Sequence, residues 1–131
     1  MVDASAIIEY ILRTPYADVC RQTIEAQDVE LHVPALCDVE VTAVVRRALL
    51  AARLMEDRAR FALMDYMDLP ITRHGHQALL PRILTLYHDF SAYDATYVAL
   101  AERLGADLLT GDRALANAAK KHAGVNVLQG W

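Results

Sequence analysis

The segment from Ser91 to Asp112 constrains the fold most strongly, because a helix, a short strand and an acid follow one another there. Ser91 is a good helix N-cap, and Gly105 can adopt the left-handed conformation that ends a helix. Residues 106–110 are short and mostly apolar, which predicts a buried strand. Asp94 lies in the first turn of the helix, and Asp112 follows the strand. Because strand ends and helix starts meet at one edge of an α/β sheet, we expect the chemistry at that edge.

Helices and short strands alternate along the whole chain. Further helices are expected over 6–12, 15–26, 35–50, 53–67, 77–87 (interrupted at Pro81) and 112–122. Strands are expected over 1–3, 31–33, 69–72 and 125–128, and Pro70 places the third of these at a sheet edge. The first strand is unusually short, since only two residues precede Asp3. This alternation predicts one α/β domain over residues 1–131, a parallel sheet with helices on both faces.

Three helices show apolar patterns that concern packing or partners. Helix 6–12 is apolar over nearly its whole circumference, which predicts a partner surface as well as a core contact. In helix 53–67 the apolar residues stand among many charges: Leu54, Phe61, Leu63, Met64 and Met67. In the helix after Ser91 one apolar face is expected from Tyr93, Tyr97, Leu100 and Leu104. Trp131 is a further candidate for a dimer contact, which the sequence does not decide.

Length and composition fit an ordinary globular domain. The chain has 131 residues, 55% of them hydrophobic and 23% charged, which excludes a disordered chain. No apolar run is long enough to span a bilayer, and the start lacks a signal-peptide pattern. We therefore expect a soluble, cytoplasmic protein with no membrane contact. Cys20 and Cys37 form no CxxC pair and have no zinc-type spacing, so we interpret them as reduced, small apolar residues.

The net charge of −4 argues against strong non-specific binding to nucleic acid. It does not exclude a nucleic-acid substrate. If four of the 17 acidic residues bind metal, the remaining 13 match the 13 Lys and Arg residues, and the rest of the surface is balanced.

Four acids lie at the end of an expected strand or near the start of an expected helix: Asp3, Glu40, Asp94 and Asp112. Two unit charges about 4 Å apart repel by about 4 kcal/mol at an effective dielectric near 20, so such a cluster must bind a cation or take up protons. Carboxylate oxygens favour Mg²⁺ or Mn²⁺. These ions can supply an activated water and neutralise charge on a phosphodiester, which makes nucleic acid the natural substrate class.

The motifs around these acids are Val2-Asp-Ala-Ser5, Pro34-Ala-Leu-Cys-Asp-Val-Glu40, Ser91-Ala-Tyr-Asp94 and Leu109-Thr-Gly-Asp112. They resemble the motifs of PIN-domain proteins, and most closely those of the VapC group of bacterial toxins. The likeness covers the whole chain in order and spacing. It implies a three-layer α/β/α PIN fold with a central, mostly parallel sheet. It also implies a Mg²⁺- or Mn²⁺-dependent endoribonuclease that cuts tRNA or rRNA, forms a homodimer and is neutralised by a VapB-type antitoxin covering a groove beside the active site.

The resemblance also assigns site residues. Asp3, Glu40, Asp94 and Asp112 would be the catalytic, metal-binding acids. Ser5 and Thr110 match polar positions beside them and would give supporting hydrogen bonds.

Other charged residues receive weaker interpretations. Arg46, Arg47 and Arg113 are candidates for contacts with RNA phosphate, although a solvated helix face explains them equally well. Asp38 lies two residues before Glu40, and residues two apart do not share a helix face, so only one of the two should enter the site. His74 and His76, and the isolated His32, His88 and His122, are interpreted as structural or exposed.

Two other functions fit the sequence less well. The same fold could bind RNA or a partner without turnover, although the presence of all four acids counts against this. A phosphatase of the haloacid-dehalogenase type would need an acid at Ser5, and a receiver domain would need a lysine earlier than Lys120.

Overall fold

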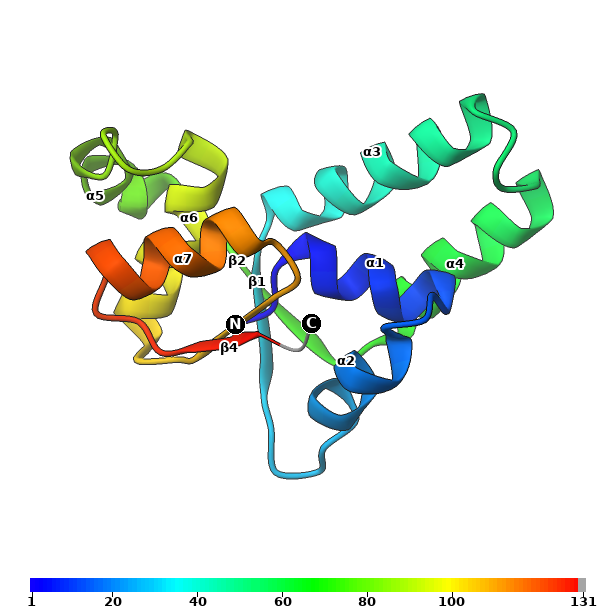
Figure 1. Cartoon of the computed structure of the whole chain (residues 1–131), viewed down its shortest axis with the longest axis horizontal. Coiled ribbons are helices and arrows are strands. Elements are labelled where there is room, and N and C mark those ends of the chain that lie inside the picture. The colour runs from blue at the N-terminus through cyan, green and yellow to red at the C-terminus, as the bar shows by residue number, and fades with distance from the viewer. Residues whose placement is uncertain (130–131) are drawn as a thin grey trace.

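A computed structural model describes residues 1–129 of the chain (Figure 1). Trp131, a candidate dimer contact, lies outside this range. The helices are α1 (Ala4–Leu12), α2 (Ala17–Ile24), α3 (Leu36–Leu50), α4 (Glu56–Asp68), α5 (Leu80–Thr85), α6 (Ala92–Leu104) and α7 (Arg113–His122), with a 3₁₀ turn η1 (Gln77–Leu79). The strands are β1 (Leu31–Pro34), β2 (Ile71–His74), β3 (Leu108–Thr110) and β4 (Val127–Gln129). Within this range no helix combines the length and the apolar character needed to cross a bilayer.

The strands form two parallel pairs that the first three residues join. β1 pairs with β2, and β3 pairs with β4. Between the pairs, the Val2 amide donates to the His32 carbonyl at 3.0 Å. On the other side, the Leu109 amide donates to the Met1 carbonyl and the Asp3 amide to the Leu109 carbonyl, both at 2.9 Å. The predicted first strand is therefore a short parallel bridge at the centre of the strands.

Two expectations near prolines need correction. The strand expected over 69–72 begins at Ile71, because α4 continues to Asp68 and Pro70 has no N–H to give to a ladder. Among the described strands β2 pairs with β1 alone, so it lies at an edge as predicted. Pro81 does not interrupt a helix but lies in the first turn of α5, where a proline removes only an N–H that has no helical partner.

Helix α1 does not have the free apolar face that its sequence predicts. Ala6, Ile7 and Ile11 are fully buried, and the partly buried Ile8, Tyr10 and Leu12 pack against the same core. The helix packs against α2, α3, α4 and β3, so the domain itself covers most of its circumference. The apolar pattern of α1 thus reflects its central position and not a partner surface.

Helix α6 has the predicted ends but a different buried surface. The Ser91 hydroxyl accepts a hydrogen bond from the Asp94 amide, and Gly105 ends the helix with φ 59°. All residues from 95 to 101 are buried, because α5, β1 and β3 pack around the helix. Tyr97 and Leu100 belong to this core, whereas Tyr93 and Leu104 are exposed, so the predicted four-residue apolar face is half wrong.

Helices α3 and α4 form an arm that projects away from the strands (Figure 1). The arm buries part of its apolar side chains, but several large ones are exposed on it: Val39, Leu50, Met55, Phe61, Met64 and Met67. We call these six residues the arm surface. The apolar residues of helix 53–67 therefore face solvent at three of the five predicted positions, and the arm, not α1, offers an unburied apolar area.

Candidate active site

The structure brings all four predicted acids to one cleft of about 540 Å³. Asp3 follows the central bridge and is the N-cap of α1, and Asp112 follows β3 and is the N-cap of α7. Asp94 lies in the first turn of α6, and Glu40 in the first turns of α3. Four separate elements thus present their carboxylates at the edge expected from an α/β topology.

Ser5 and Thr110 hold Asp3 in place. Their hydroxyls donate to Oδ2 of Asp3 at 2.6 and 2.7 Å, and the two hydroxyl oxygens are 3.3 Å apart. The Gly111 amide donates to the Ser5 hydroxyl at 2.9 Å, and the Asp112 amide to the Thr110 hydroxyl at 3.0 Å. Asp3 is only 7% exposed, so this network fixes a buried carboxylate and links it to the loop that carries Asp112.

Asp112 and Glu40 are each tied by one oxygen. Oδ1 of Asp112 accepts from the amides of Ala114 and Leu115 at 2.8 and 3.0 Å, which is an N-cap contact. Oε2 of Glu40 accepts from the Tyr97 hydroxyl at 2.5 Å. Sequence reasoning missed this role of Tyr97. The available signal was its position three residues after Asp94, which places both side chains on neighbouring parts of α6.

Burial and mutual repulsion make these carboxylates hard to ionise together. Burial is the main cause that raises the pKa of Asp3, of Glu40 and of Asp94. The charges of Asp3 and Asp94 raise the pKa of Glu40 further, and those of Asp112 and Asp3 do the same for Asp94. The Ser5 and Thr110 hydrogen bonds act in the opposite direction on Asp3. A bound cation would remove this strain, because it favours the ionised form of every carboxylate.

The donor set fits Mg²⁺ or Mn²⁺ as an open site. Within residues 1–129, no three Asp, Glu, His or Cys side chains are arranged to hold an ion as they stand. One oxygen each of Asp3, Glu40 and Asp112 is engaged in a hydrogen bond, and the charges of the acids repel one another. Mg²⁺ needs few protein ligands because it keeps several waters, so an open ring of carboxylates suits it.

The three candidate arginines lie in different surroundings. Arg47 lines the cleft with the acids. Arg46, its neighbour, instead lines a groove between α3 and α4. Arg113 is exposed at the start of α7 and is not among the residues that line the cleft. Of the three candidates, Arg47 is the one placed beside the acids.

Asp38 stays outside the cleft that Glu40 lines, so only one of these two acids enters it, as their spacing predicts. It accepts from the Tyr66 hydroxyl at 2.6 Å and from Nε of Arg73 at 2.8 and 3.1 Å. Among the histidines, His32 is not isolated, because its Nδ1 lies 3.0 Å from Nε2 of His74 on the neighbouring strand. This pair lies outside the cleft and adds nothing to the acid cluster.

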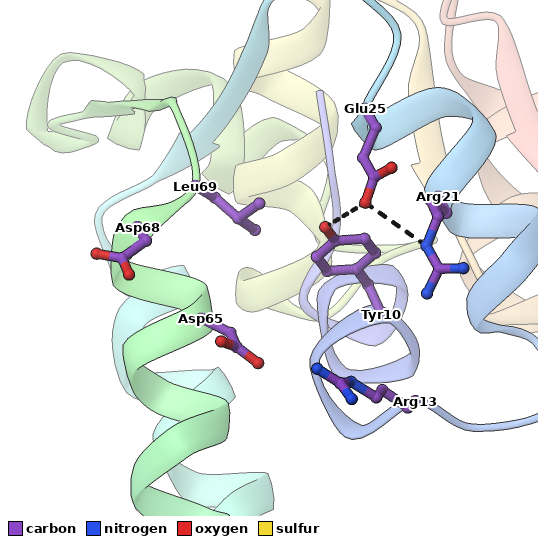
Figure 2. A pocket seen from close by; sticks show the side chains of 7 residues that line it. All are labelled: Tyr10, Arg13, Arg21, Glu25, Asp65, Asp68 and Leu69. Carbon is purple, nitrogen blue, oxygen red and sulfur yellow. Dashed lines mark hydrogen bonds and ion pairs between the residues drawn. The ribbon is translucent and has the colours of Figure 1, made fainter.

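A second cavity, of about 390 Å³, lies between α1, α2 and α4 (Figure 2). Figure 2 shows Asp65 and Asp68 on one side of it and Arg21 and Glu25 on the other. The Tyr10 hydroxyl donates to Glu25 at 2.7 Å, and Arg21 lies 3.5 Å from the same carboxylate. Its three carboxylates are accompanied by two arginines, so its excess of negative charge is smaller than that of the acid cleft, where four carboxylates are accompanied by one arginine.

Comparison with known proteins agrees with this geometry. The PIN domain family matches residues 1–121. VapC ribonuclease Mb0985 of Mycobacterium bovis is 38% identical over 128 residues, which is 98% of this chain and 97% of that protein. Ribonuclease VapC12 of Mycobacterium tuberculosis is 30% identical over 128 residues, 98% of each chain. The crystal structure of PAE2754 from Pyrobaculum aerophilum matches the fold with a TM-score of 0.71 at 20% identity, over 96% of this chain and 80% of that one.

The fold and the cleft define a PIN domain, and the relatives cover nearly the full chain. The protein therefore belongs to the PIN-domain family and, within it, to the VapC group. The α/β fold with parallel strands predicted from the sequence is confirmed.

Proposed function

We propose that the protein is a Mg²⁺- or Mn²⁺-dependent endoribonuclease toxin that hydrolyses phosphodiester bonds of tRNA or rRNA. One observation carries the proposal: carboxylates from four separate elements line one cleft, where burial raises the pKa values of Asp3, Glu40 and Asp94 and the neighbouring acids raise those of Glu40 and Asp94 further. The relatives are named as ribonucleases, which supports the same activity for this chain.

In this mechanism Asp3, Glu40, Asp94 and Asp112 would hold the metal. The bound metal would supply an activated water and neutralise charge on the phosphate. Ser5 and Thr110 fix the orientation of Asp3 through their hydrogen bonds. Arg47, which lines the same cleft, would bind a phosphate of the RNA and help to place the scissile bond.

The test is cleavage of a mixed pool of tRNA and rRNA by the purified protein in Mg²⁺, Mn²⁺ or EDTA. The Asp94→Asn variant, which keeps the size and the backbone cap but loses the charge, runs alongside. We expect discrete cuts that require metal and disappear in the variant. Full activity of Asp94→Asn, or undiminished cutting in EDTA, would contradict the proposal.

A binding module without turnover is the second candidate. It is favoured by one observation: within the described residues no three potential ligands are arranged to hold an ion. Calorimetry with Mn²⁺ separates the two functions, because a nuclease awaiting its substrate still binds the ion. A binding module would show no metal-dependent heat.

We propose that a VapB-type antitoxin covers the arm surface. Its six residues are apolar and exposed, and Val39 also lines the cleft, so a segment bound at Val39 would lie beside the acids. The substitution Met64→Asp should prevent neutralisation by the product of a neighbouring reading frame while RNA cleavage continues. Neutralisation that survives Met64→Asp would argue against this surface.

The homodimer is proposed to use a different apolar groove, of about 530 Å³, on the α5 side. It is lined by Leu80, Ile83, Leu84, Tyr87, Phe90 and Ala92. Because the arm surface is assigned to the antitoxin, this groove remains for a second copy. Leu84→Asp should convert the dimer to a monomer in light scattering and leave antitoxin binding intact. If Leu84→Asp still forms a dimer, the dimer contact lies outside this groove.

A further inference from the structure

Tyr97 joins the two helices that carry Glu40 and Asp94. Its side chain is only 1% exposed, although it is one of the largest in the core. Its hydroxyl donates to Oε2 of Glu40 at 2.5 Å, across 57 positions of sequence. The Cys37 thiol, one turn before Glu40, also contacts this hydroxyl. A ring packed this closely cannot turn away, so the hydroxyl offers its hydrogen at a fixed point beside the cleft.

Glu40 depends more than Asp3 and Asp112 on a hydrogen-bond donor from another element to fix its carboxylate. Asp3 is fixed by two hydroxyls, and Asp112 by amides of the helix that it caps. Glu40 has one more rotatable bond than an aspartate, so ordering its side chain costs more conformational entropy. Its carboxylate also faces the charges of Asp3 and Asp94. Without a donor on the protein side, repulsion would turn it toward solvent.

We infer that Tyr97 is a positioning residue of the metal site. Its hydroxyl binds Oε2 of Glu40, a residue that lines the cleft, and this contact would leave the other oxygen of the carboxylate for the metal. Because the donor is neutral, it fixes the carboxylate without cancelling the negative charge that attracts a cation. The inference rests on the proposed metal-dependent function and adds a residue outside the four acids.

The chain offers a matched control for this bond. Tyr66 is also buried, and its hydroxyl donates to a carboxylate of the same helix, Asp38, at 2.6 Å. Asp38 lies outside the cleft. Tyr97→Phe and Tyr66→Phe therefore remove the same atom from the same kind of contact, and they differ in whether the carboxylate belongs to the acid cluster.

The experiment measures Mn²⁺ affinity by calorimetry on the full chain, free of any partner. We expect Tyr97→Phe to weaken Mn²⁺ binding about ten-fold, a typical loss when the hydrogen-bond partner of a metal ligand is removed. Tyr66→Phe should leave it unchanged. In cleavage assays, Tyr97→Phe should need more metal to reach full rate, with the KM for RNA unaltered. In a Glu40→Gln background, Tyr97→Phe should cause no further loss of Mn²⁺ affinity.

The outcomes separate this inference from the proposed function. Wild-type protein that binds no Mn²⁺ would refute both. Mn²⁺ binding that Tyr97→Phe does not change, or that Tyr66→Phe weakens equally, would overturn the role of Tyr97 and leave the metal site standing. If Tyr97→Phe does not fold, Glu40→Asp replaces it, because it keeps the charge but withdraws it from the hydroxyl. Unchanged Mn²⁺ affinity in Glu40→Asp would again overturn the inference.

Discussion

Helix α3 presents two carboxylates, each bonded to a buried tyrosine, in two different electrostatic settings. Asp38 receives the Tyr66 hydroxyl and an ion pair from Arg73, whose guanidinium lies 5.2 Å from the centre of the Tyr66 ring. Glu40 receives the Tyr97 hydroxyl but faces the charges of Asp3 and Asp94. Arg73 neutralises the charge of Asp38, so this carboxylate serves the fold and leaves no excess charge for a cation. The second has a neutral donor and excess negative charge, so it remains available to a cation.

The largest expected effect is on RNA cleavage. Glu40→Gln removes a charge that the metal needs, so the single-turnover rate of cleavage should fall by about 100-fold or more. Asp38→Asn makes the same isosteric change two residues earlier and should keep cleavage near the wild-type rate. The measurement is single-turnover cleavage in saturating Mn²⁺. Equal losses in the two variants would show that the contrast between the carboxylates is not functional.

The same two variants should change metal-free stability in opposite directions. Burial, with the charges of Asp3 and Asp94, raises the pKa of Glu40, so the folded protein binds this proton more readily than the unfolded chain. Its contribution therefore becomes unfavourable as the pH rises through that raised pKa. At pH 7 in EDTA, urea denaturation should find Glu40→Gln more stable than wild type. Asp38→Asn loses a partly exposed ion pair and should be less stable, by up to about 1 kcal/mol.

The stabilisation of the wild-type protein by added Mn²⁺ should depend on pH. The raised pKa values of Asp3, Glu40 and Asp94 mean that metal must compete with protons at low pH. The increase in melting temperature on adding Mn²⁺ should therefore be larger at pH 7 than at pH 5. Asp38→Asn should preserve this difference, and Glu40→Gln should reduce it. A metal shift of equal size at both pH values would exclude carboxylates of raised pKa as the ligands.

The smallest expected effect concerns the two neighbouring arginines of α3. Arg47 lines the cleft and Arg46 the groove between α3 and α4. Arg47→Gln should weaken RNA binding several-fold and reduce the slope of log affinity against log salt by about 1. Arg46→Gln should leave both unchanged. Filter binding over a salt series, with the inactive Asp94→Asn protein as background, tests this, and equal effects would contradict the assignment.

Local signals predicted most of the fold. Ser91 and Gly105 mark the ends of α6 because capping depends on a few neighbouring atoms. Packing was predicted less well. The apolar circumference of α1 suggested a partner, but three helices and a strand of the same domain cover it. A sequence pattern shows that a surface is apolar, and only the tertiary arrangement shows what covers it.

The candidate site was likewise predicted in part. Topology alone predicts that Asp3, Glu40, Asp94 and Asp112 converge, because each follows a strand or lies near the start of a helix. The roles of the individual acids stay a prediction. Tyr97 was interpreted only as an apolar residue, because its contact with Glu40 depends on how α6 lies against α3. No local pattern encodes a hydroxyl that meets its acceptor across the fold.

The fold and the active site both depend on the central bridge formed by Met1, Val2 and Asp3. Its backbone hydrogen bonds are the link between β1–β2 and β3–β4, and its last residue is an acid of the cleft. Local opening there would separate the strand pairs and displace Asp3 in one event. Amide hydrogen exchange at Val2 and Leu109 should therefore report the same opening that stops catalysis. A molecule that has begun to unfold at this bridge is already an inactive nuclease.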